Sequence, residues 1–392
     1  MMVLFNILQW VLYLFFITGT IYLLVFSIAG FCYKPVKQTP SFNFKKFIVL
    51  IPGYKEDKVI LEVARKTLDQ DYPKDFFDVI VIADSFMAET IVQLKNMNLE
   101  VKEVHFEKSS KARSLNVTMD SLSDEYEVVL ILDADNIISH DFISRMNQGF
   151  NNGYVAIQGH RLAKNLNTHF AILDALSEEI NNNIFRRGHR KLGLSAALIG
   201  SGMGFDFPLY KSLMRDIDSY GEDKELEHNL LKKGITIEYL DEALVYDEKI
   251  TLSQVFVSQR TRWMANQLNY VKNYLKEGVI ELFHGHIDYF DKIVQHLLPP
   301  RIIILGFLSI IVVLSLMFNP ISWDLAWLIQ WMLCILALVI SVPKHLISLK
   351  SGIALFYLPY GFFLMLVSLT RVKNARKGFV HTTHTVTLNN KK

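Results

Sequence analysis

The sequence has little cysteine, almost no net charge and no internal repeat. Cys32 and Cys334 are the two cysteines among 392 residues, each in or beside an apolar block, so no disulfide framework is expected. A net charge of +2 gives no basis for nucleic-acid binding. No Gly-x-Gly-x-x-Gly motif follows the first predicted strand, which disfavours a dinucleotide site. These absences fit a cytosolic domain without nucleic acid as a partner.

Apolar residues, by contrast, are abundant and unevenly spread. They make up 51% of the chain, more than an ordinary water-soluble enzyme of this size contains. The excess lies in residues 3–31 and in three later blocks, Ile302–Phe318, Leu325–Val342 and Ile353–Leu369. The first block is long enough to cross a bilayer. These blocks predict a multi-pass protein of the cell (inner) membrane, with the lipid bilayer as a partner.

Charges beside the first block indicate its orientation. No basic segment precedes the block and no clear cleavage site follows it, which predicts an uncleaved anchor. Lys34 and Lys37 come directly after it, so the next domain is expected in the cytosol. Three complete spans near the carboxyl end would leave the basic tail outside, against the same tendency. The number of complete spans and the side of the tail therefore stay open.

The composition predicts five consecutive segments. They are a transmembrane anchor (1–33), a cytosolic catalytic domain (45–250), amphipathic interfacial helices (251–300), transmembrane helices (301–370) and a basic tail (371–392). Within the cytosolic domain, apolar runs at 47–51, 79–83 and 128–132 alternate with helical patterns at 60–68 and 112–122. Such alternation implies right-handed crossovers and a mostly parallel sheet. The fold class is therefore α/β, inserted between an amino-terminal transmembrane helix and a carboxyl-terminal helical bundle.

Acidic residues follow two of these strands directly. Asp133 and Asp135 end the run that begins at Val128, and Asp84 ends the run at 79–83. Because parallel strands present their carboxyl ends at one edge of a sheet, these carboxylates are expected to lie together. Asp133 and Asp135 offer hard oxygens to Mg²⁺ or Mn²⁺, or they belong to a solvated turn. Lys111, at a predicted helix start, suits a phosphate group or is a surface lysine.

These residues carry a resemblance to the family 2 glycosyltransferases. The matching motifs are Val49–Glu56, Gln70–Pro73, the strand end at Asp84, Lys111-Ala112 and Asp133-Ala134-Asp135. The resemblance implies a GT-A domain that binds a UDP-sugar. Its implied donor-binding residues are Tyr54, Glu56, Asp84, Lys111, Asp133 and Arg262, and its implied metal ligands are Asp133 and Asp135, for Mg²⁺ or Mn²⁺. Two positions depart from the family pattern: Lys55 stands where Asn is usual, and Ser85 where an acidic residue, Gly or Asn is commoner.

Three later motifs extend the resemblance to membrane-bound polysaccharide synthases. Gly200-Ser201-Gly202 is either a tight turn or a loop similar to the family's acceptor loop. Glu222-Asp223 opens a helix, where acidic residues are ordinary dipole partners, but it resembles the motif whose Asp is the general base. Gln259, Arg262 and Trp263 match the Gln-x-x-Arg-Trp signature of the synthases for cellulose, chitin, hyaluronan and poly-N-acetylglucosamine. The resemblance implies Asp223 as the catalytic residue, with Gly200, Ser201, Gly202, Glu222, Gln259 and Trp263 at the acceptor.

The sequence therefore predicts an inverting, processive hexosyltransferase. It would move a sugar from UDP-glucose or UDP-N-acetylglucosamine to the non-reducing end of a growing β-linked polysaccharide, coupled to export with a possible accessory export subunit. One alternative is transfer of a single sugar to a lipid-linked acceptor. Another is a catalytically silent membrane protein that binds nucleotide sugars. The identity of the sugar and its linkage is not encoded in these motifs, because the shape of a pocket decides it.

Overall fold

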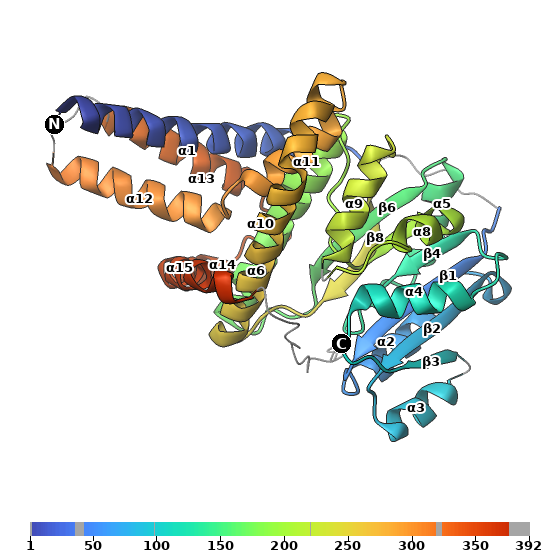
Figure 1. Cartoon of the computed structure of the whole chain (residues 1–392). Helices are drawn as coiled ribbons and strands as arrows, with labels where there is room; N and C mark the ends of the chain where they lie inside the picture. Colours follow the sequence, from blue (N-terminus) through green and yellow to red (C-terminus); the bar gives the residue numbers. More distant parts are fainter. Residues whose placement is uncertain (1, 36–42, 98, 220, 319–323, 376–392) are drawn as a thin grey trace.

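A computed structural model describes residues 2–35, 43–97, 99–219, 221–318 and 324–375 (Figure 1). The predicted tail lies mostly outside these ranges. In chain order the elements are α1 (Met2–Phe31), β1 (Phe47–Tyr54), α2 (Ile60–Leu68), η1 (Lys74–Phe76), β2 (Phe77–Asp84), α3 (Ala88–Lys95), β3 (Glu100–Val104), α4 (Lys111–Ser121), β4 (Val128–Ile131), β5 (Ile137–Ile138), α5 (Phe142–Asn151), β6 (Ala156–Ala163), α6 (His169–Asn181), η2 (Asn182–Gly188), α7 (His189–Lys191), β7 (Met203–Asp206), α8 (Phe207–Met214), α9 (Glu222–Lys232), β8 (Glu238–Asp247), α10 (Ser253–Phe283), α11 (Ile287–Leu297), α12 (Arg301–Phe318), α13 (Asp324–Ile340), η3 (Lys344–Leu346), α14 (Leu349–Leu355) and α15 (Leu358–Ala375).

The domain between α1 and α10 contains one mixed sheet of eight strands in the order β3-β2-β1-β4-β7-β6-β8-β5. Strands β3, β2, β1 and β4 are parallel, as are β6 and β8. Strand β7 is antiparallel to both of its neighbours, and the short β5 is antiparallel to β8. The predicted α/β class with a mostly parallel sheet is therefore confirmed, with β7 as the element that turns the sheet mixed.

Both faces of the sheet are covered, which explains the continuous apolar runs. Phe47, Val49 and Ile51 of β1 pack into one core, on the side of α2 and α5. Ile48 and Leu50 alternate with them and pack into a second core, on the side of α4 and α8. A strand that is buried on both faces needs apolar residues at every position. This double burial fixes the strands and holds their carboxyl ends at one edge.

The apolar run at 47–51 predicts a strand that ends before Pro52, and this boundary is wrong. Pro52 and Gly53 continue the parallel pairing with β2 as far as Tyr54. Strand β4 pairs with β1 only at residues 47–50, so the β4 side of β1 is open beyond that point. A proline without an N–H is tolerated in a strand where that side has no partner. The strand thus reaches further toward the site than the sequence pattern indicated.

The apolar blocks form a helical bundle at one end of the molecule (Figure 1). Among the described residues, one helix, α1, is long and apolar enough to cross a membrane, and the total is up to three if each bent pair of helices forms one span. Helices α1 and α13 pack together, and α12 packs against α13. The last predicted block is broken, because α14 and α15 meet at an angle of 49°. Figure 1 shows α15 nearly end-on while α1 and α12 lie in the plane of the picture, so α15 runs across them.

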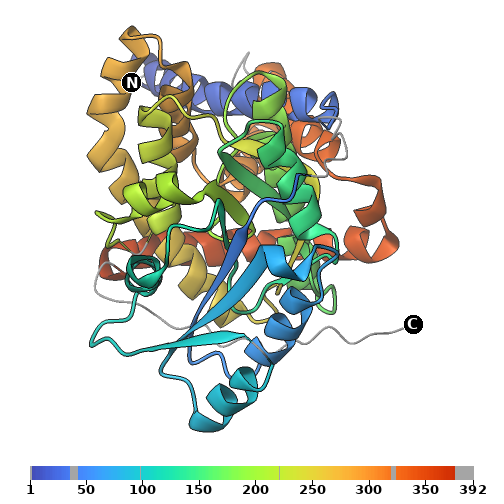
Figure 2. The same cartoon turned by 90° about the vertical axis from the view of Figure 1, so that its right-hand side faces the viewer.

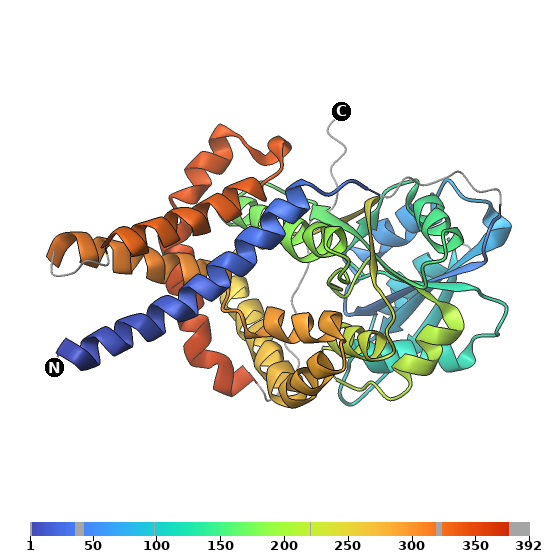
Figure 3. The ribbon, with the colours of Figure 1, turned by 90° about the horizontal axis from the view of Figure 1, so that it is seen from above.

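Two helices stand between the sheet and this bundle. Figures 1 and 3 place α6 and α10 in the middle of the molecule, with the sheet on one side and α1, α12 and α13 on the other. Helix α10 packs along α11 and α15, while α6 contacts α14. Figure 2, a view from the sheet side, shows the bundle behind the strands. The space bounded by the sheet edge, α6 and α10 is where the candidate site lies.

Candidate active site

One large cavity connects the sheet edge with the helical bundle. Its volume is about 1170 Å³, larger than the usual range for a small-molecule site of about 300–1,000 Å³. At what we call the donor end, it is lined by Asp84, Lys111, Asp133 and Glu222. At the opposite end, which we call the membrane end, the lining includes Arg260, Arg301, Leu305, Leu338, Val342, Leu355 and Leu358. A single continuous space therefore has two chemically different halves.

Strands β1, β2 and β4 bring the acidic residues of the donor end together. Strands β2 and β4 flank β1 in parallel, so Asp84 and Asp133 reach the same edge as Tyr54. Asp84 is 2% exposed, and its Oδ1 accepts a hydrogen bond from the Ser85 hydroxyl at 2.9 Å. Its Oδ2 is buried and has no partner among the described residues. A buried carboxylate oxygen without a donor is costly, and an N–H of a bound nucleobase would satisfy it.

The two departures from the family pattern occupy unusual backbone positions. Lys55 and Ser85 have φ values of 57° and 59°, and they are the non-glycine residues with positive φ in the described part of the chain. Asn and Gly adopt this left-handed conformation more readily than Lys or Ser. The amide of Lys55 donates to the carbonyl oxygen of Asp84 at 3.1 Å, which holds the two turns together. Both turns border the donor end.

Lys111 lies at the centre of the donor end. It opens α4, whose first turn is capped by Ser110, since the Ser110 hydroxyl accepts from the Arg113 amide at 3.2 Å. Its ammonium donates to Asp133 and to the carbonyl of Gly200, and it lies 3.5 Å from Glu222. Burial alone would lower the pKa of this ammonium, but the carboxylates of Asp133 and Glu222 raise it above its ordinary value. Lys111 therefore stays charged, and its ammonium connects α4 with Asp133 after β4, with the loop at Gly200 and with the start of α9.

The glycine-dense loop before β7 supports Asp133 from behind. Gly200 lines the cavity, with a φ of 84°. Ser201 is fully buried, and its hydroxyl accepts from the Asp133 amide at 2.9 Å. A Cβ on Gly202 would lie 2.4 Å from Val245, so a side chain does not fit there. The acceptor roles predicted for Ser201 and Gly202 stay predictions, and both residues lie behind the cavity lining.

Glu222 and Asp223 begin α9 and both line the cavity. Glu222 is 8% exposed, and burial, followed by the charges of Asp223 and Asp133, raises the pKa of its carboxyl to about 7 despite Lys111. Burial also raises the pKa of Asp223, although Lys224 and Lys111 act in the opposite direction. Raised carboxyl pKa values in a cleft are typical of proton-transfer groups. The geometry brings the predicted base to the donor end.

Gln259, Arg262 and Trp263 all line the cavity from α10. Glu222 and Asp133 act electrostatically on Arg262, which places this guanidinium toward the donor end. The ring of Trp263 is stacked by the guanidinium of Arg260 at 4.3 Å, and the residue is 39% exposed. Leu252 precedes α10 and is 63% exposed. Phe256, one turn further on, lines the cavity and also packs against a small apolar cluster.

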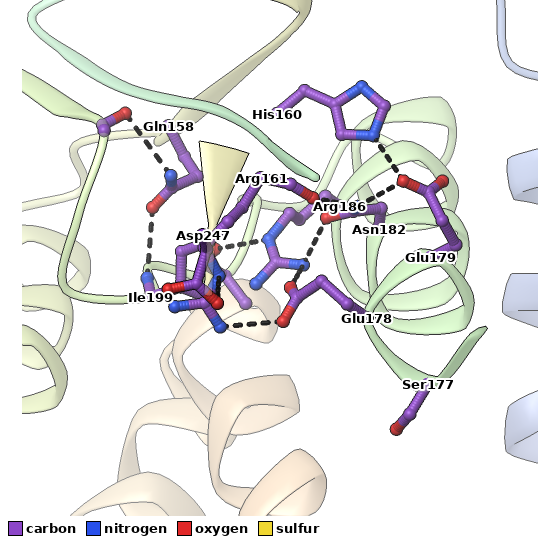
Figure 4. Close-up of polar contacts among 12 residues, drawn as sticks. Gln158, His160, Arg161, Ser177, Glu178, Glu179, Asn182, Arg186, Ile199 and Asp247 are labelled. Atoms are coloured by element: carbon purple, nitrogen blue, oxygen red, sulfur yellow. Dashed lines mark hydrogen bonds and ion pairs between the residues drawn. The ribbon is translucent and has the colours of Figure 1, made fainter. Parts of the chain in front are cut away.

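A buried ionic network also lines this cavity and was not predicted. Arg161 donates to Glu178 at 2.7 Å, and Arg186 lies 3.4 Å from the same carboxylate (Figure 4). Arg186 belongs to a π-helical segment, η2, that continues α6, and such segments often occur near functional sites. Burial raises the pKa of Glu178, but Arg161 and the other cations outweigh it and hold that pKa well below its usual range. The sequence signal that could have indicated this network is Glu178, an acidic residue on the apolar face of α6.

The carboxylates of the donor end suit a metal that arrives with its substrate. No cluster of three or more His, Cys, Asp or Glu within residues 2–375, gaps excluded, could hold an ion alone. Mg²⁺ commonly takes one or two carboxylates and completes its shell with phosphate oxygens and water. Asp133 and Asp135 both line the cavity and provide hard oxygens of this kind. The residues therefore fit the predicted metal, with Lys111 as a neighbour of the site.

Comparisons with known proteins agree with this fold. The family model described as "Glycosyltransferase like family 2" matches residues 45–266, more than half of the chain. This chain belongs to that family, and it is a glycosyltransferase enzyme. The fold resembles the mannosyltransferase PcManGT from Pyrobaculum calidifontis, solved in complex with GDP-Man and Mn²⁺. The TM-score is 0.51 at 14% identity, over 91% of this chain and 99% of that one.

The matches to curated relatives cover only part of each relative. The poly(ribitol-phosphate) beta-N-acetylglucosaminyltransferase TarS of Staphylococcus aureus is 28% identical over 100 residues, which are 24% of this chain and 17% of TarS. The probable glycosyltransferase YdaM of Bacillus subtilis is 23% identical over 269 residues, 62% of each chain. The match thus spans less than a fifth of TarS and under two thirds of YdaM. These likenesses support glycosyl transfer, whereas donor and acceptor have to be inferred from the site.

Proposed function

We propose that this enzyme transfers one sugar, with inversion, from a UDP-sugar to a lipid-linked acceptor. The observation that carries the proposal is the single cavity that joins the carboxylates of the donor end to a membrane end with many apolar side chains. UDP-glucose and UDP-N-acetylglucosamine are the proposed donors. The unsatisfied Oδ2 of Asp84 supports a base with a ring N–H, such as uracil, and Arg262 supports a diphosphate beside Asp133.

The donor end supports the following chemistry. Asp133 and Asp135 would hold Mg²⁺ or Mn²⁺, whose charge neutralises the departing UDP. Asp223 takes the proton from an acceptor hydroxyl as its oxygen forms a bond to C1 of the sugar. The bond between C1 and the β-phosphate oxygen breaks on the opposite face, and UDP leaves with the electron pair. Lys111, already among these carboxylates, orients Asp133 and adds positive charge near the phosphates.

The membrane end supports a lipid tail better than a glycan. Its far walls are built from Leu305, Leu338, Val342, Leu355 and Leu358. A polysaccharide placed there would bury hydroxyl groups against apolar side chains, and each unsatisfied hydroxyl costs about 1–3 kcal/mol. An acyl or isoprenyl chain makes favourable contacts with the same walls. The cell membrane, with the catalytic domain in the cytosol, is the proposed location.

Exposed apolar side chains support the same location. Leu14 of α1 is 56% exposed, Val313 of α12 is 54% exposed and Val339 of α13 is 61% exposed. Large apolar surfaces of this kind are unfavourable in water and suit contact with lipid. The bundle would then bring the membrane end of the cavity close to the bilayer, from which a lipid-linked acceptor could enter.

Processive extension of a β-linked polysaccharide is the second candidate. It is favoured by Gln259, Arg262 and Trp263, which line the cavity together, because an aromatic face can hold a sugar without demanding one hydroxyl pattern. Export of the product and an accessory export subunit belong to this candidate alone. The two candidates share the donor chemistry and differ only in what occupies the membrane end.

Product analysis tests the proposal. The full chain in nanodiscs is incubated with UDP-glucose, UDP-N-acetylglucosamine or GDP-mannose, with and without a membrane lipid extract, and nucleotide release is measured. We expect release from one UDP-sugar that depends on the extract, with labelled sugar entering the organic phase as a single addition. A long product formed without lipid would favour the second candidate, and release from GDP-mannose alone would overturn the donor assignment.

A further inference from the structure

Two arginines mark the boundary between the polar and apolar parts of the cavity. We propose that Arg260 and Arg301 form a subsite for the phosphate of the acceptor lipid, between its hydroxyl-bearing head and its apolar tail. This inference rests on the proposed function, and it names the acceptor class as an anionic amphiphile. Both side chains line the cavity, one from α10 and one from the first position of α12.

Arg301 lines this space and has a donor without a partner among the described residues. Its Nη2 donates to the carbonyl oxygen and the hydroxyl of Ser177, at 3.0 and 3.1 Å. Its Nη1 is buried and has no acceptor among the residues that the structure describes. Both hydrogen bonds of Arg301 thus go to a neutral residue of α6, which Figure 4 labels together with Glu178. A guanidinium without a carboxylate partner in a buried position favours a bound anion.

Arg260 approaches the same region from the other side. Its Nη2 donates to the carboxylate of Asp174, and these side chains are 13% and 15% exposed. Its Nε is buried and has no acceptor in the described part of the chain. The guanidinium lies over the rings of Trp263 and Phe256, at 4.3 and 5.2 Å from their centres. These rings hold the plane of the guanidinium in place, which prepares it for an anion.

Arg260 and Arg186 repel the guanidinium of Arg301 electrostatically, whereas the carboxylate of Glu178 attracts it. Asp174 is the carboxylate in direct contact with Arg260. A phosphate placed between Arg260 and Arg301 would accept hydrogen bonds from both free N–H groups and remove the repulsion between them. Bidentate or paired arginine contacts to phosphate are among the stronger polar interactions in proteins.

Neighbouring residues indicate what lies on each side of the phosphate. Toward the donor end, the Oε1 of Gln259 is buried without a partner among the described residues, and Trp263 offers an exposed ring. These groups suit a hydroxyl-bearing sugar or glycerol head. Toward the bundle, Leu305 lies one turn beyond Arg301 on α12, and Leu358 opens α15. Groups that suit a head, a phosphate and an apolar tail therefore all line the same cavity.

Acceptors with and without a phosphate test this subsite in the intact protein. Three probes share an apolar tail and a hydroxyl-bearing head: phosphatidylglycerol, a sugar linked to a long isoprenyl chain through diphosphate, and an uncharged alkyl glycoside. We expect a lower KM for at least one of the phosphate-bearing probes than for the glycoside. The phosphate-bearing probe that the enzyme glycosylates shows which class of acceptor it takes, either a bilayer phospholipid or an isoprenoid-linked sugar. Equal KM values for charged and uncharged probes would overturn the subsite.

Variants connect that preference to the two arginines. Arg301→Gln should raise KM for the phosphate-bearing acceptor by about 10- to 100-fold, as expected for loss of a hydrogen bond to a charged group, and leave kcat and the KM of the glycoside nearly unchanged. Arg260→Gln should act in the same direction, and Arg301→Lys should recover part of the loss. Lys350→Gln is the matched control, because Lys350 is an exposed cation on α14 that does not line the cavity.

The outcomes separate the subsite from the proposed function. If Arg301→Gln weakens the charged and uncharged acceptors equally, the arginine is structural and the subsite is wrong, while lipid transfer stands. If no lipid probe is glycosylated but a polymer forms, the acceptor assignment itself is wrong. UDP affinity by calorimetry and thermal melting check that each variant is folded. If Arg301→Gln does not fold, the comparison of probes on the unaltered enzyme still decides the matter.

Discussion

The two ends of the cavity treat charge in opposite ways. At the donor end, the protein compensates its own charges, since Lys111 lies among Asp133 and Glu222 and keeps these groups in place without a ligand. At the membrane end, Arg301 contacts neutral groups and part of its guanidinium has no acceptor in the described chain. The comparison suggests that the donor site is preorganised, whereas the membrane end is completed by the charge of its ligand.

Metal removal should give the largest effect, and it concerns the donor end alone. Asp133 and Asp135 are the hard ligands of the proposed metal, so EDTA should abolish turnover and added Mg²⁺ or Mn²⁺ should restore it. Nucleotide release is the measurement. Binding of the acceptor lipid to nanodisc-embedded enzyme should persist in EDTA if the membrane end is independent. Full turnover in the presence of the chelator would remove the metal role of both carboxylates.

Substitution of the proposed base should have the next largest effect. Asp223→Asn keeps the size of the side chain but cannot take a proton, so kcat should fall by about 10²- to 10⁴-fold. Calorimetry with UDP should give an unchanged affinity, because the substitution spares Asp133 and Asp84. A loss of UDP affinity would show instead that Asp223 belongs to the donor site. Glu225→Gln serves as the control, since Glu225 also lies in the first turn of α9 and does not line the cavity.

Replacing the aromatic ring between the two ends should have a smaller effect. Trp263 is 39% exposed, so Trp263→Leu should fold. Loss of a stacking contact of about 0.5–1.5 kcal/mol should raise KM for the acceptor by about 3- to 10-fold, with UDP affinity unchanged. Product sizing sharpens the comparison. If the unaltered enzyme makes a long polymer and Trp263→Leu makes only short products, the processive candidate replaces lipid transfer.

The smallest expected effect is a shift of the pH profile. Burial raises the pKa of Asp223, and it raises that of Glu222 to about 7, so the ionised base is lost as pH falls and kcat/KM should decline on the acidic side. Glu222→Gln removes one of the two interacting carboxyls, so this acidic limb should move to lower pH while activity at pH 8 is retained. A profile that does not move would show that Glu222 does not influence the base.

The carboxyl of Glu222 also predicts how stability depends on pH. The direction of this dependence is opposite to that expected for a carboxylate in an ordinary ion pair. The pKa of Glu222 rises from 4.5 to about 7 on folding, so the folded state binds more protons than the unfolded state between these values. Stability should therefore fall as pH rises through this window, by an amount that Glu222→Gln removes. Melting temperatures at pH 5 and pH 8 for both proteins give the measurement. A parallel pH dependence in the two proteins would contradict the raised pKa.

Local sequence patterns determined the strands and the edge at which the chemistry lies. The apolar runs before Asp84 and Asp133 are buried on both faces, and a parallel arrangement follows from their alternation with helices. Once the strands are parallel, the acidic residues at their ends must meet at one edge, so this part of the site could be predicted. The continuation of β1 through Pro52 could not, because it depends on how far β4 extends beside it.

Only the tertiary structure decided which charges face each other. Arg260 contacts Asp174 across 86 residues of sequence, and Lys111 contacts Gly200 across 89. Nothing in the periodicity of α10 indicates that one side of the helix borders a cavity instead of a core, since an amphipathic pattern specifies a face and not its neighbour. Arg301 reads in sequence as the residue before an apolar block. Its unused donor becomes visible only when α6, α10 and α12 converge around it, because a buried charge acquires its role from the groups that surround it.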